Sequence, residues 1–274
     1  MNSNIMTKIT SLAYITFKGG IRDRTIHTIV ILALLLLIST PLFSSFSMRQ
    51  VVAVAVDYNL STISFIGLLL SIFAGINLIT KDIDKRSIYT VISLPLSRSQ
   101  YLIAKFFGLV SLIFFSLLIL TLFGSISIKL TSYLYPQDIN SQIYWLKFFL
   151  SIFYIALKLI IIVSAVFLFS SFATSTFLPL VLSFIFYFIG ESIEEVKIFI
   201  EGVGKEKTSS IVKAIAQFAY YIFPNLSAFD LKAHAIYGLP LDYGNLLFVF
   251  LYSIFYTAII LTLSVMIFRR REFL

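Results

Sequence analysis

Long apolar stretches dominate the hydrophobic pattern of this chain. Five of them run 23 or more residues with at most one charged residue in each. They are Thr25–Met48, Tyr58–Thr80, Phe106–Ile128, Phe148–Gly190 and Tyr243–Phe268. About 20 apolar residues in a helix cross the hydrocarbon core of a bilayer, which is about 30 Å thick. The pattern therefore predicts an all-α integral membrane protein.

The fourth stretch is long enough for two crossings, because its 43 residues would extend about 64 Å as one helix. A polar run at 170–176, followed by Pro179, is the expected fold-back. The sequence therefore predicts six transmembrane helices in a single domain, residues 1–274.

Two segments outside these stretches also show helical periodicity. In residues 1–24, apolar residues from Ile5 to Phe17 recur at helical spacing, which predicts an amphipathic helix on the cytoplasmic membrane surface. A disordered tail is the alternative. The segment 191–242 is predicted to lie outside, and Ile211, Ile215 and Phe218 share a helical face within it. That helix, ended by Pro224-Asn225, is either interfacial or re-entrant, or packed on its neighbours.

Composition and charge agree with a membrane protein. Hydrophobic residues make up 59% and charged residues 12%, against about 25% charged in soluble domains. The net charge of +8 does not indicate nucleic acid, because lysines and arginines cluster beside the span ends. With six crossings, one face carries twelve of them and the opposite face eight. The positive-inside rule places both termini in the cytoplasm of a multi-pass cell-membrane protein.

Residues for catalysis or cofactor binding are few. The chain has no cysteine, and His27 and His234 lie too far apart to suggest a metal site, so no metal or cofactor is expected. Gly204-Lys205 lacks the remaining residues of a nucleotide-binding loop, which argues against ATP hydrolysis by this chain. All thirteen acidic residues fall outside the apolar stretches, which disfavours an ion-coupled carrier.

One charge does fall inside an apolar stretch. Lys158 is about ten residues from either end of its predicted span, too far for the amine to reach the interface comfortably. It therefore needs a wet cavity or a polar partner, and Tyr154 lies one turn away. A transport-pathway contact and an interhelical hydrogen bond to backbone carbonyls are the two interpretations.

Small residues repeat every four positions in the second stretch, at Gly67, Ser71 and Gly75. Such spacing lets helix backbones approach closely. It favours a packing seam within the chain over a dimer interface.

The segment Lys81–Lys105, KDIDKRSIYTVISLPLSRSQYLIAK, carries the most specific motif. It resembles the type-2 ATP-binding-cassette (ABC) permease family, whose loop between spans two and three has an acidic residue, Gly-Thr, Pro-x-Ser-Arg and Gly-Lys. Asp82 stands at the acidic position, and Lys105 matches the lysine. Pro95, Ser97 and Arg98 match the middle motif, whereas Arg86-Ser87 and Ala104 depart from it.

Further points of resemblance are RDR at 22–24, FPNLSAFDL at 223–231 and FRRREF at 268–273. The chain is most similar to stand-alone six-span permeases, including those of the nitrous-oxide-reductase maturation type. The resemblance implies that a short coupling helix in the 81–105 loop sits in a cleft of a separate ATPase. Asp84, Arg86 and Ile88 would contribute charge and apolar contact there, with Pro95 ending the helix. The alternative is a solvated loop that only orients the chain.

The resemblance predicts a permease subunit, not an enzyme, in a transporter of two permease chains and two ATPase chains. The second permease chain would be the same or a different one, and export is the expected direction. A non-ABC polytopic protein, such as a secondary carrier or a membrane assembly factor, is the alternative.

Overall fold

The computed structural model describes residues 2–47, 49–84, 97–136, 142–173, 175–202 and 209–270. Within these ranges every regular element is a helix, so the all-α prediction is confirmed. The elements are α1 (Asn2–Ile21), α2 (Arg24–Ile38), α3 (Thr40–Ser44), α4 (Val51–Asp84), α6 (Arg98–Leu134), α7 (Trp145–Phe172), α8 (Phe177–Glu201), α9 (Ser210–Ile222), the 3₁₀ turn η1 (Ser227–Phe229), α10 (Lys232–Tyr237) and α11 (Tyr243–Arg270).

Among the described residues, five helices are long and apolar enough to cross a membrane: α4, α6, α7, α8 and α11. The first predicted span is divided into α2, of 15 residues, and α3, of five. Pro41 in the first turn of α3 has no backbone N–H to continue the helix across Ser39. The α2 helix alone extends only about 22 Å, so the count of six crossings stays a prediction.

The 43-residue stretch is two helices, as predicted. Helix α7 ends at Phe172 and α8 begins at Phe177, with Ser170 and Ser171 in the last turn of α7. The Ser171 hydroxyl lies 2.8 Å from that of Ser264, which joins this end of α7 to α11.

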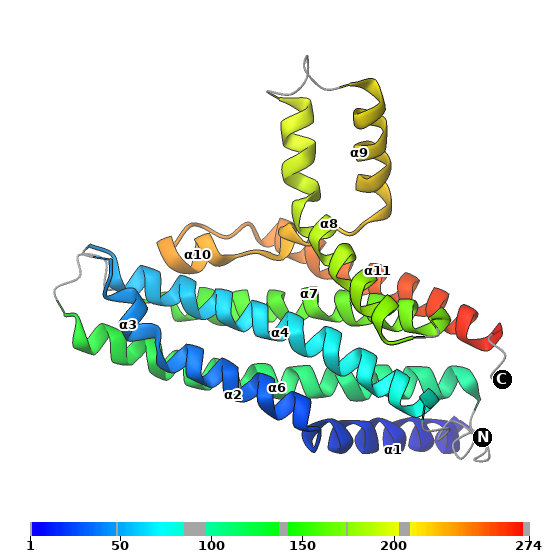
Figure 1. Cartoon of the computed structure of the whole chain (residues 1–274). Coiled ribbons are helices and arrows are strands. Elements are labelled where there is room, and N and C mark those ends of the chain that lie inside the picture. The colour runs from blue at the N-terminus through cyan, green and yellow to red at the C-terminus, as the bar shows by residue number, and fades with distance from the viewer. Residues whose placement is uncertain are drawn as a thin grey trace.

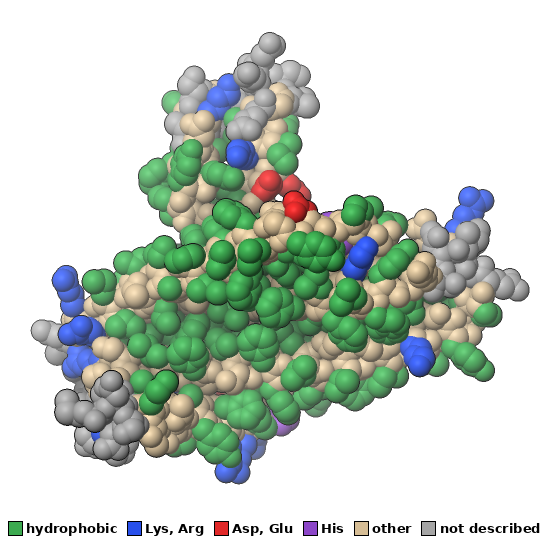
Figure 2. Space-filling model, turned by 180° about the vertical axis from the view of Figure 1, so that it is seen from behind, with side chains coloured by type: hydrophobic (Ala, Val, Ile, Leu, Met, Phe, Trp, Pro, Cys, Tyr) green, Lys and Arg blue, Asp and Glu red, His purple; other side chains and the backbone are tan. Residues whose placement is uncertain are grey.

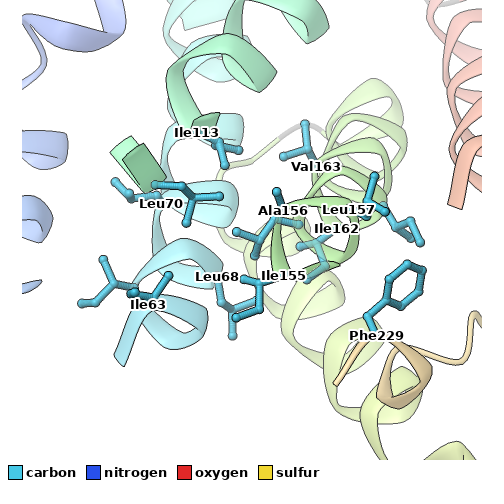
Figure 3. Packing of buried hydrophobic residues seen from close by; sticks show 14 of the residues in the cluster. Ile63, Leu68, Leu70, Ile113, Ile155, Ala156, Leu157, Ile162, Val163 and Phe229 are labelled. Carbon is cyan, nitrogen blue, oxygen red and sulfur yellow. The ribbon is translucent and has the colours of Figure 1, made fainter. Parts of the chain in front are cut away.

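The core lies around α7, which packs against α4, α6, α8 and α11. These helices run along the bundle in Figure 1. Apolar side chains of α4, α6 and α7 meet between the helices, with Phe229 of η1 at the side (Figure 3). Phe148 and Phe167 of α7 are fully buried. Helix α7 is therefore the central element of the fold.

Helix α1 lies along the first half of α6 (Figure 1). The two backbones approach closely at Gly108, where an added Cβ would lie 2.7 Å from the carbonyl oxygen of Ala13. The Phe17 and Phe115 rings pack edge to face at 5.7 Å. Residues 2–21 are thus a docked helix and not a disordered tail, whereas their position at the membrane surface stays a prediction.

The segment 191–242 has two structurally different parts. Helix α8 continues past the apolar stretch to Glu201, and its outer half and α9 project sideways from the bundle as a hairpin (Figure 1). Residues 223–242 then return along α7, burying Leu226 and Phe229. The Lys147 ammonium donates to the Gly238 and Leu239 carbonyls at 2.6 and 2.7 Å. Much of the predicted outside segment is therefore packed on the bundle.

Candidate functional site

An ion pair lies in the middle of the bundle. The Lys158 ammonium of α7 is 3.0 and 3.2 Å from the two Glu191 carboxylate oxygens of α8. Lys158 is 4% exposed, whereas the Glu191 side chain is 31% exposed. The Tyr187 ring, one turn before Glu191, lies 5.8 Å from the ammonium. The buried lysine is thus held by a carboxylate and an aromatic face of one helix.

The backbone of α8 is fixed directly beside this pair. The Gly190 carbonyl accepts a hydrogen bond from the Leu226 N–H at 2.9 Å. A Cβ at Gly190 would lie 2.8 Å from the Pro224 carbonyl oxygen, so only glycine permits this approach. One turn beyond the glycine, Glu194 accepts a hydrogen bond from the Asn225 amide.

Two tyrosines of α11 hold the returning chain at the same level. The Asn225 N–H donates to the Tyr252 hydroxyl at 3.1 Å, and the Tyr256 hydroxyl donates to the Ile222 carbonyl at 2.5 Å. The bonds of Glu191, Asn225 and Ile222 attach the hairpin to α7 and α11. Those of Gly190 and Glu194 join α8 to the returning chain. The residues called the hairpin root below are Gly190, Glu191, Glu194, Ile222 and Asn225.

The small-residue repeat of α4 faces α7, inside the chain's own bundle. A Cβ at Gly67 would lie 2.4 Å from Leu159, and one at Gly75 would lie 2.8 Å from Val166. Ser71, between them, is fully buried and donates to the Gly67 carbonyl at 2.8 Å. The repeat thus brings α4 close to α7 on the side of α7 that includes Leu159, next to Lys158.

The predicted coupling segment is described only at its two ends. Asp82 and Asp84 lie in the last turn of α4, without described side chains, and Arg86, Ile88 and Pro95 lie outside the described residues. At the other end, Ser97 caps α6: its hydroxyl accepts from the Gln100 N–H, and its own N–H donates to the Gln100 side chain. This reciprocal pair fixes where α6 begins.

The start of α6 contacts the end of α11. The Arg98 guanidinium donates to the Arg269 carbonyl at 3.3 Å. Tyr101 stacks on Phe268 at 6.2 Å, and the Lys105 ammonium lies 5.7 Å from the Tyr101 ring. Lys105 is buried at 9% exposure. Two motifs whose contacting residues are 171 positions apart in the sequence are thus joined at the end of the bundle where α1 begins (Figure 1).

A family model described as ABC-2 family transporter protein matches residues 3–273 of the chain. The chain belongs to the ABC-2 transporter family. It is a multi-pass membrane permease of an ABC transporter, and the family implies an ABC ATPase as its partner. A search of curated proteins finds no match.

In this ABC-2 permease, the partner of Lys158 is the residue that sequence reasoning missed. The sequence predicted a wet cavity or a polar partner for Lys158 without identifying that partner, and the structure supplies the Glu191 carboxylate rather than backbone carbonyls. Glu191 directly follows the fourth apolar stretch, Phe148–Gly190, so it was placed outside the predicted span. Because α8 continues as a helix from Phe177 through Glu191 to Glu201, Glu191 lies at the level of Lys158. The spacing of Tyr187 and Glu191 on one helical face was the available signal.

The ABC-2 permease therefore has two candidate sites that differ in position and in chemistry: a contact at the ends of α6 and α11, and a buried ion pair. The contact between α6 and α11 is at the ends of two long helices, beside the 81–105 segment. The ion pair is at the centre, where a lysine and a glutamate neutralise each other in surroundings that disfavour isolated charge. Neither arrangement positions a nucleophile or a phosphate-binding loop among the described residues.

Proposed function

We propose that this ABC-2 permease is one of two permease chains in an exporter driven by two copies of a separate ATPase. The ATPase would bind the 81–105 segment, and the substrate would move between the permease chains. The observation that carries this proposal is the continuity of the helices on either side of the segment. Helix α4 has 34 residues and α6 has 37, each without interruption.

Length supports a role for these helices in force transmission. A helix of 37 residues extends about 55 Å, whereas the hydrocarbon core is about 30 Å thick. Both helices can therefore extend beyond the bilayer at the end where the segment joins them. Closure of the ATPases on binding ATP would push this end and tilt α4 and α6 against α7.

The close α4–α7 packing gives such a tilt a defined path. Gly67, Ser71 and Gly75 leave few protruding side chains on α4, so its surface can shift against α7. The Lys158–Glu191 pair keeps α8 attached to α7 during the movement, and when opened it would expose a lysine to the pathway. In this sequence of events Lys158 first joins two helices through Glu191 and then contacts the transport pathway.

The proposed orientation puts both termini and the 81–105 segment in the cytoplasm. If α2 and α3 together form the first of six crossings, both termini and this segment lie on the side that carries more lysine and arginine. The positive-inside rule assigns that side to the cytoplasm. In this arrangement the permease chain itself hydrolyses no ATP.

Two charge reversals on α6 test the proposal, one at each end of the same helix. The assay is vanadate-sensitive ATP hydrolysis by the complex that co-purifies with the tagged permease. Arg98→Glu should lower this hydrolysis by about tenfold. The reason is that a charge change worth about 1.4 kcal/mol at the contact weakens ATPase binding tenfold. Ile88→Asp should act similarly. Lys129→Glu, at the exposed opposite end, is the matched control and should leave hydrolysis unchanged.

The control also tests orientation. Loss of the ATPase from Lys129→Glu with normal activity of Arg98→Glu would mean that the opposite end faces the ATPase. Robust ATP hydrolysis by the clean permease alone would contradict the division of work between two proteins.

A further inference from the structure

Helices α1 and α2 meet beside the middle of α6, as Figure 1 shows. At the end of α1, a Cβ added to Gly20 would lie 2.7 Å from Cδ2 of Leu112. Near the end of α2, the Leu37 carbonyl accepts a hydrogen bond from the Ser127 hydroxyl at 2.6 Å. Both contacts fall in 106–128, the uncharged run of α6 that is apolar enough to lie in hydrocarbon. The junction of α1 and α2, at residues 22–23, is therefore at membrane depth.

Four basic side chains surround this junction, and each is exposed: Lys18, Arg22, Arg24 and His27. We call them the basic cluster, and Figure 2 shows a group of lysine and arginine side chains on the lower edge of the bundle. The acidic residue among them, Asp23, accepts a hydrogen bond from the Thr25 N–H at 2.9 Å and so caps α2. The neighbouring helices add no charge there, because α4 is uncharged from 58 to 80 and α6 from 106 to 128. One carboxylate against three permanent cations leaves the cluster with a net positive charge.

Hydrocarbon does not satisfy these charges. The junction is about eight residues of α6 from the nearer end of the uncharged run, which is about 12 Å. Lysine and arginine near the end of a span extend their charged groups to the interface, but this distance exceeds the length of either side chain. The cluster therefore needs a water-filled path or an anionic ligand.

This depth refines the first crossing of the proposed topology, because it adds the second half of α1 to α2 and α3. Without Lys18, Arg22 and Arg24, the side assigned to the cytoplasm carries nine lysines and arginines and the opposite side eight. The proposed orientation is therefore unchanged.

An apolar furrow leads to the basic cluster. It lies between α1 and α6 and has a volume of about 710 Å³, which is typical of ligand sites. Its walls include Ala13, Tyr14 and Phe17 of α1 and Phe107, Phe114 and Leu118 of α6. Lys18 directly follows Phe17 and lies one turn beyond Tyr14, on the same face of α1. The apolar wall of the furrow therefore continues into the basic cluster.

A ligand that satisfies both features is an amphiphilic anion. Its anionic group would bind at the basic cluster, where arginine offers paired N–H donors that match a carboxylate or a phosphate. Its apolar part would lie along the aromatic rings of the furrow. A phospholipid at rest in the bilayer does not fit, because its phosphate stays at the interface, about 12 Å from the cluster. The chemistry thus favours a transported molecule over a structural lipid.

We propose that the furrow and the basic cluster bind the exported substrate, and that this substrate is an amphiphilic anion with a carboxylate or phosphate group. The inference rests on the proposed function for the existence of a transport pathway. It adds the class of the substrate and the residues that recognise it. The furrow would then face the path between the two permease chains.

Binding of radiolabelled dodecyl phosphate to the permease in phosphatidylcholine nanodiscs tests the anionic half of the site. Arg22→Gln should weaken binding about tenfold, because it removes a charge-assisted hydrogen bond, whereas Arg22→Lys should retain most of the affinity. Lys129→Gln, at an exposed basic position near the other end of α6, is the matched control and should bind as the unaltered chain does. Dodecyltrimethylammonium should not compete. Competition by this cation, or normal binding by Arg22→Gln, would overturn the proposal.

Two neighbouring positions of α1 test the apolar half of the site. Tyr14 lines the furrow, whereas Ile15 lies outside it, although their side chains are 62% and 63% exposed. Tyr14→Ala should weaken dodecyl phosphate binding about fivefold, because an aromatic contact is lost. Ile15→Ala should leave binding unchanged. Equal effects of the two substitutions would mean that the probe binds outside the furrow, and the proposal would be wrong.

Two further measurements identify other occupants. Competition by phosphatidylglycerol in the nanodisc, at the affinity of dodecyl phosphate, would mean that a resident lipid fills the site. Dissociation of a permease dimer by Arg22→Gln, with normal binding of the probe, would mean that an acidic surface of a second copy covers the cluster. We expect neither result, and either one would contradict the substrate assignment.

The complex with the ATPase separates the two levels of inference. Dodecyl phosphate should stimulate its vanadate-sensitive ATP hydrolysis, and Arg22→Gln should raise the half-maximal concentration about tenfold. An active complex whose probe binding is unaffected by Arg22→Gln and Tyr14→Ala would refute the site and leave the proposed function standing. A permease that binds the probe through Arg22 but recovers no ATPase would refute the proposed function and leave the anion site standing. Binding through Arg22 without stimulation of an active complex would contradict the substrate assignment.

Discussion

Helices α7 and α9 are both rich in apolar residues, yet they place them in opposite surroundings. In α7, most of the apolar residues are buried within the chain, and the buried residues lie on all sides of the helix. In α9, Ile211, Ile215 and Phe218 point away from the chain, and the polar side packs toward α8. Apolar periodicity indicates which face avoids water. It does not say whether the same chain, lipid or another chain covers that face.

The largest expected difference between the bundle and the exposed hairpin concerns the Lys158–Glu191 ion pair, which joins α7 to the hairpin root. Glu191→Ala should destabilise the monomeric chain in detergent by about 3 kcal/mol, because it leaves the buried Lys158 charge without its partner. Glu195→Ala, the same change one turn farther along the hairpin at an exposed position, should cost less than about 0.5 kcal/mol. Denaturant unfolding in mixed micelles measures both.

A double variant separates stability from transport. Lys158→Met combined with Glu191→Leu removes both charges and should recover most of the lost stability. Wild-type transport by this variant would make the pair purely structural, whereas a stable but inactive protein would place Lys158 in the pathway. Equal costs for Glu191→Ala and Glu195→Ala would refute the distinction between the hairpin root and the exposed part of α8 beyond it.

Truncation of a phenylalanine tests the same comparison without charge. Phe167 of α7 is fully buried, and its ring packs edge to face on Phe106 at 5.7 Å. Phe167→Ala should cost about 3 kcal/mol, because the cavity that it leaves loses packing contacts. Phe218→Ala on α9 should change the unfolding free energy of the monomer by less than about 0.5 kcal/mol. A large effect at Phe218 in the monomer would mean that the hairpin folds back on its own chain.

Much of the bundle could be predicted from apolar length alone. The five long helices follow from stretches of about 23 residues, and the break between α7 and α8 follows from the polar run before Pro179. Both features depend on local sequence, because every backbone group in the bilayer must bond within its own helix. The division of the first stretch was the local feature we missed, although Pro41 was its signal.

The site was harder to predict, because it depends on contacts between distant segments. Lys158 was noticed as a charge in an apolar stretch, but its partner is 33 positions away, just beyond the end of the same stretch. The contact of Arg98 with Arg269 spans 171 positions and uses a backbone carbonyl, which no side-chain pattern shows. The 81–105 motif pointed to the family that the comparison then showed. A motif of this kind can be recognised from the sequence even though its contacts in the fold cannot be calculated from it.

The smallest expected effects on stability come from the glycines of α4. Replacing Gly67 and Gly75 by alanine should cost different amounts of unfolding free energy. A Cβ at Gly75 would lie 2.8 Å from Cγ1 of Val166 and 3.3 Å from Cδ2 of Leu109. Valine is β-branched and stiff at χ1, so it cannot rotate away and the helices must separate. Gly75→Ala should therefore cost about 1–2 kcal/mol.

Gly67→Ala should cost less than Gly75→Ala, although the nominal approach of 2.4 Å is shorter. The atom that it meets is Cδ1 of Leu159, the far end of a flexible side chain that can change rotamer. Gly19→Ala on α1 is the control, since nothing lies within 4 Å of its added Cβ, and it should stabilise the helix by about 0.5 kcal/mol. Thermal unfolding of the three variants in one detergent measures the order. If Gly67→Ala proved the most damaging, Leu159 would be locked in place, and α4 could not shift along α7 as the coupling proposal requires.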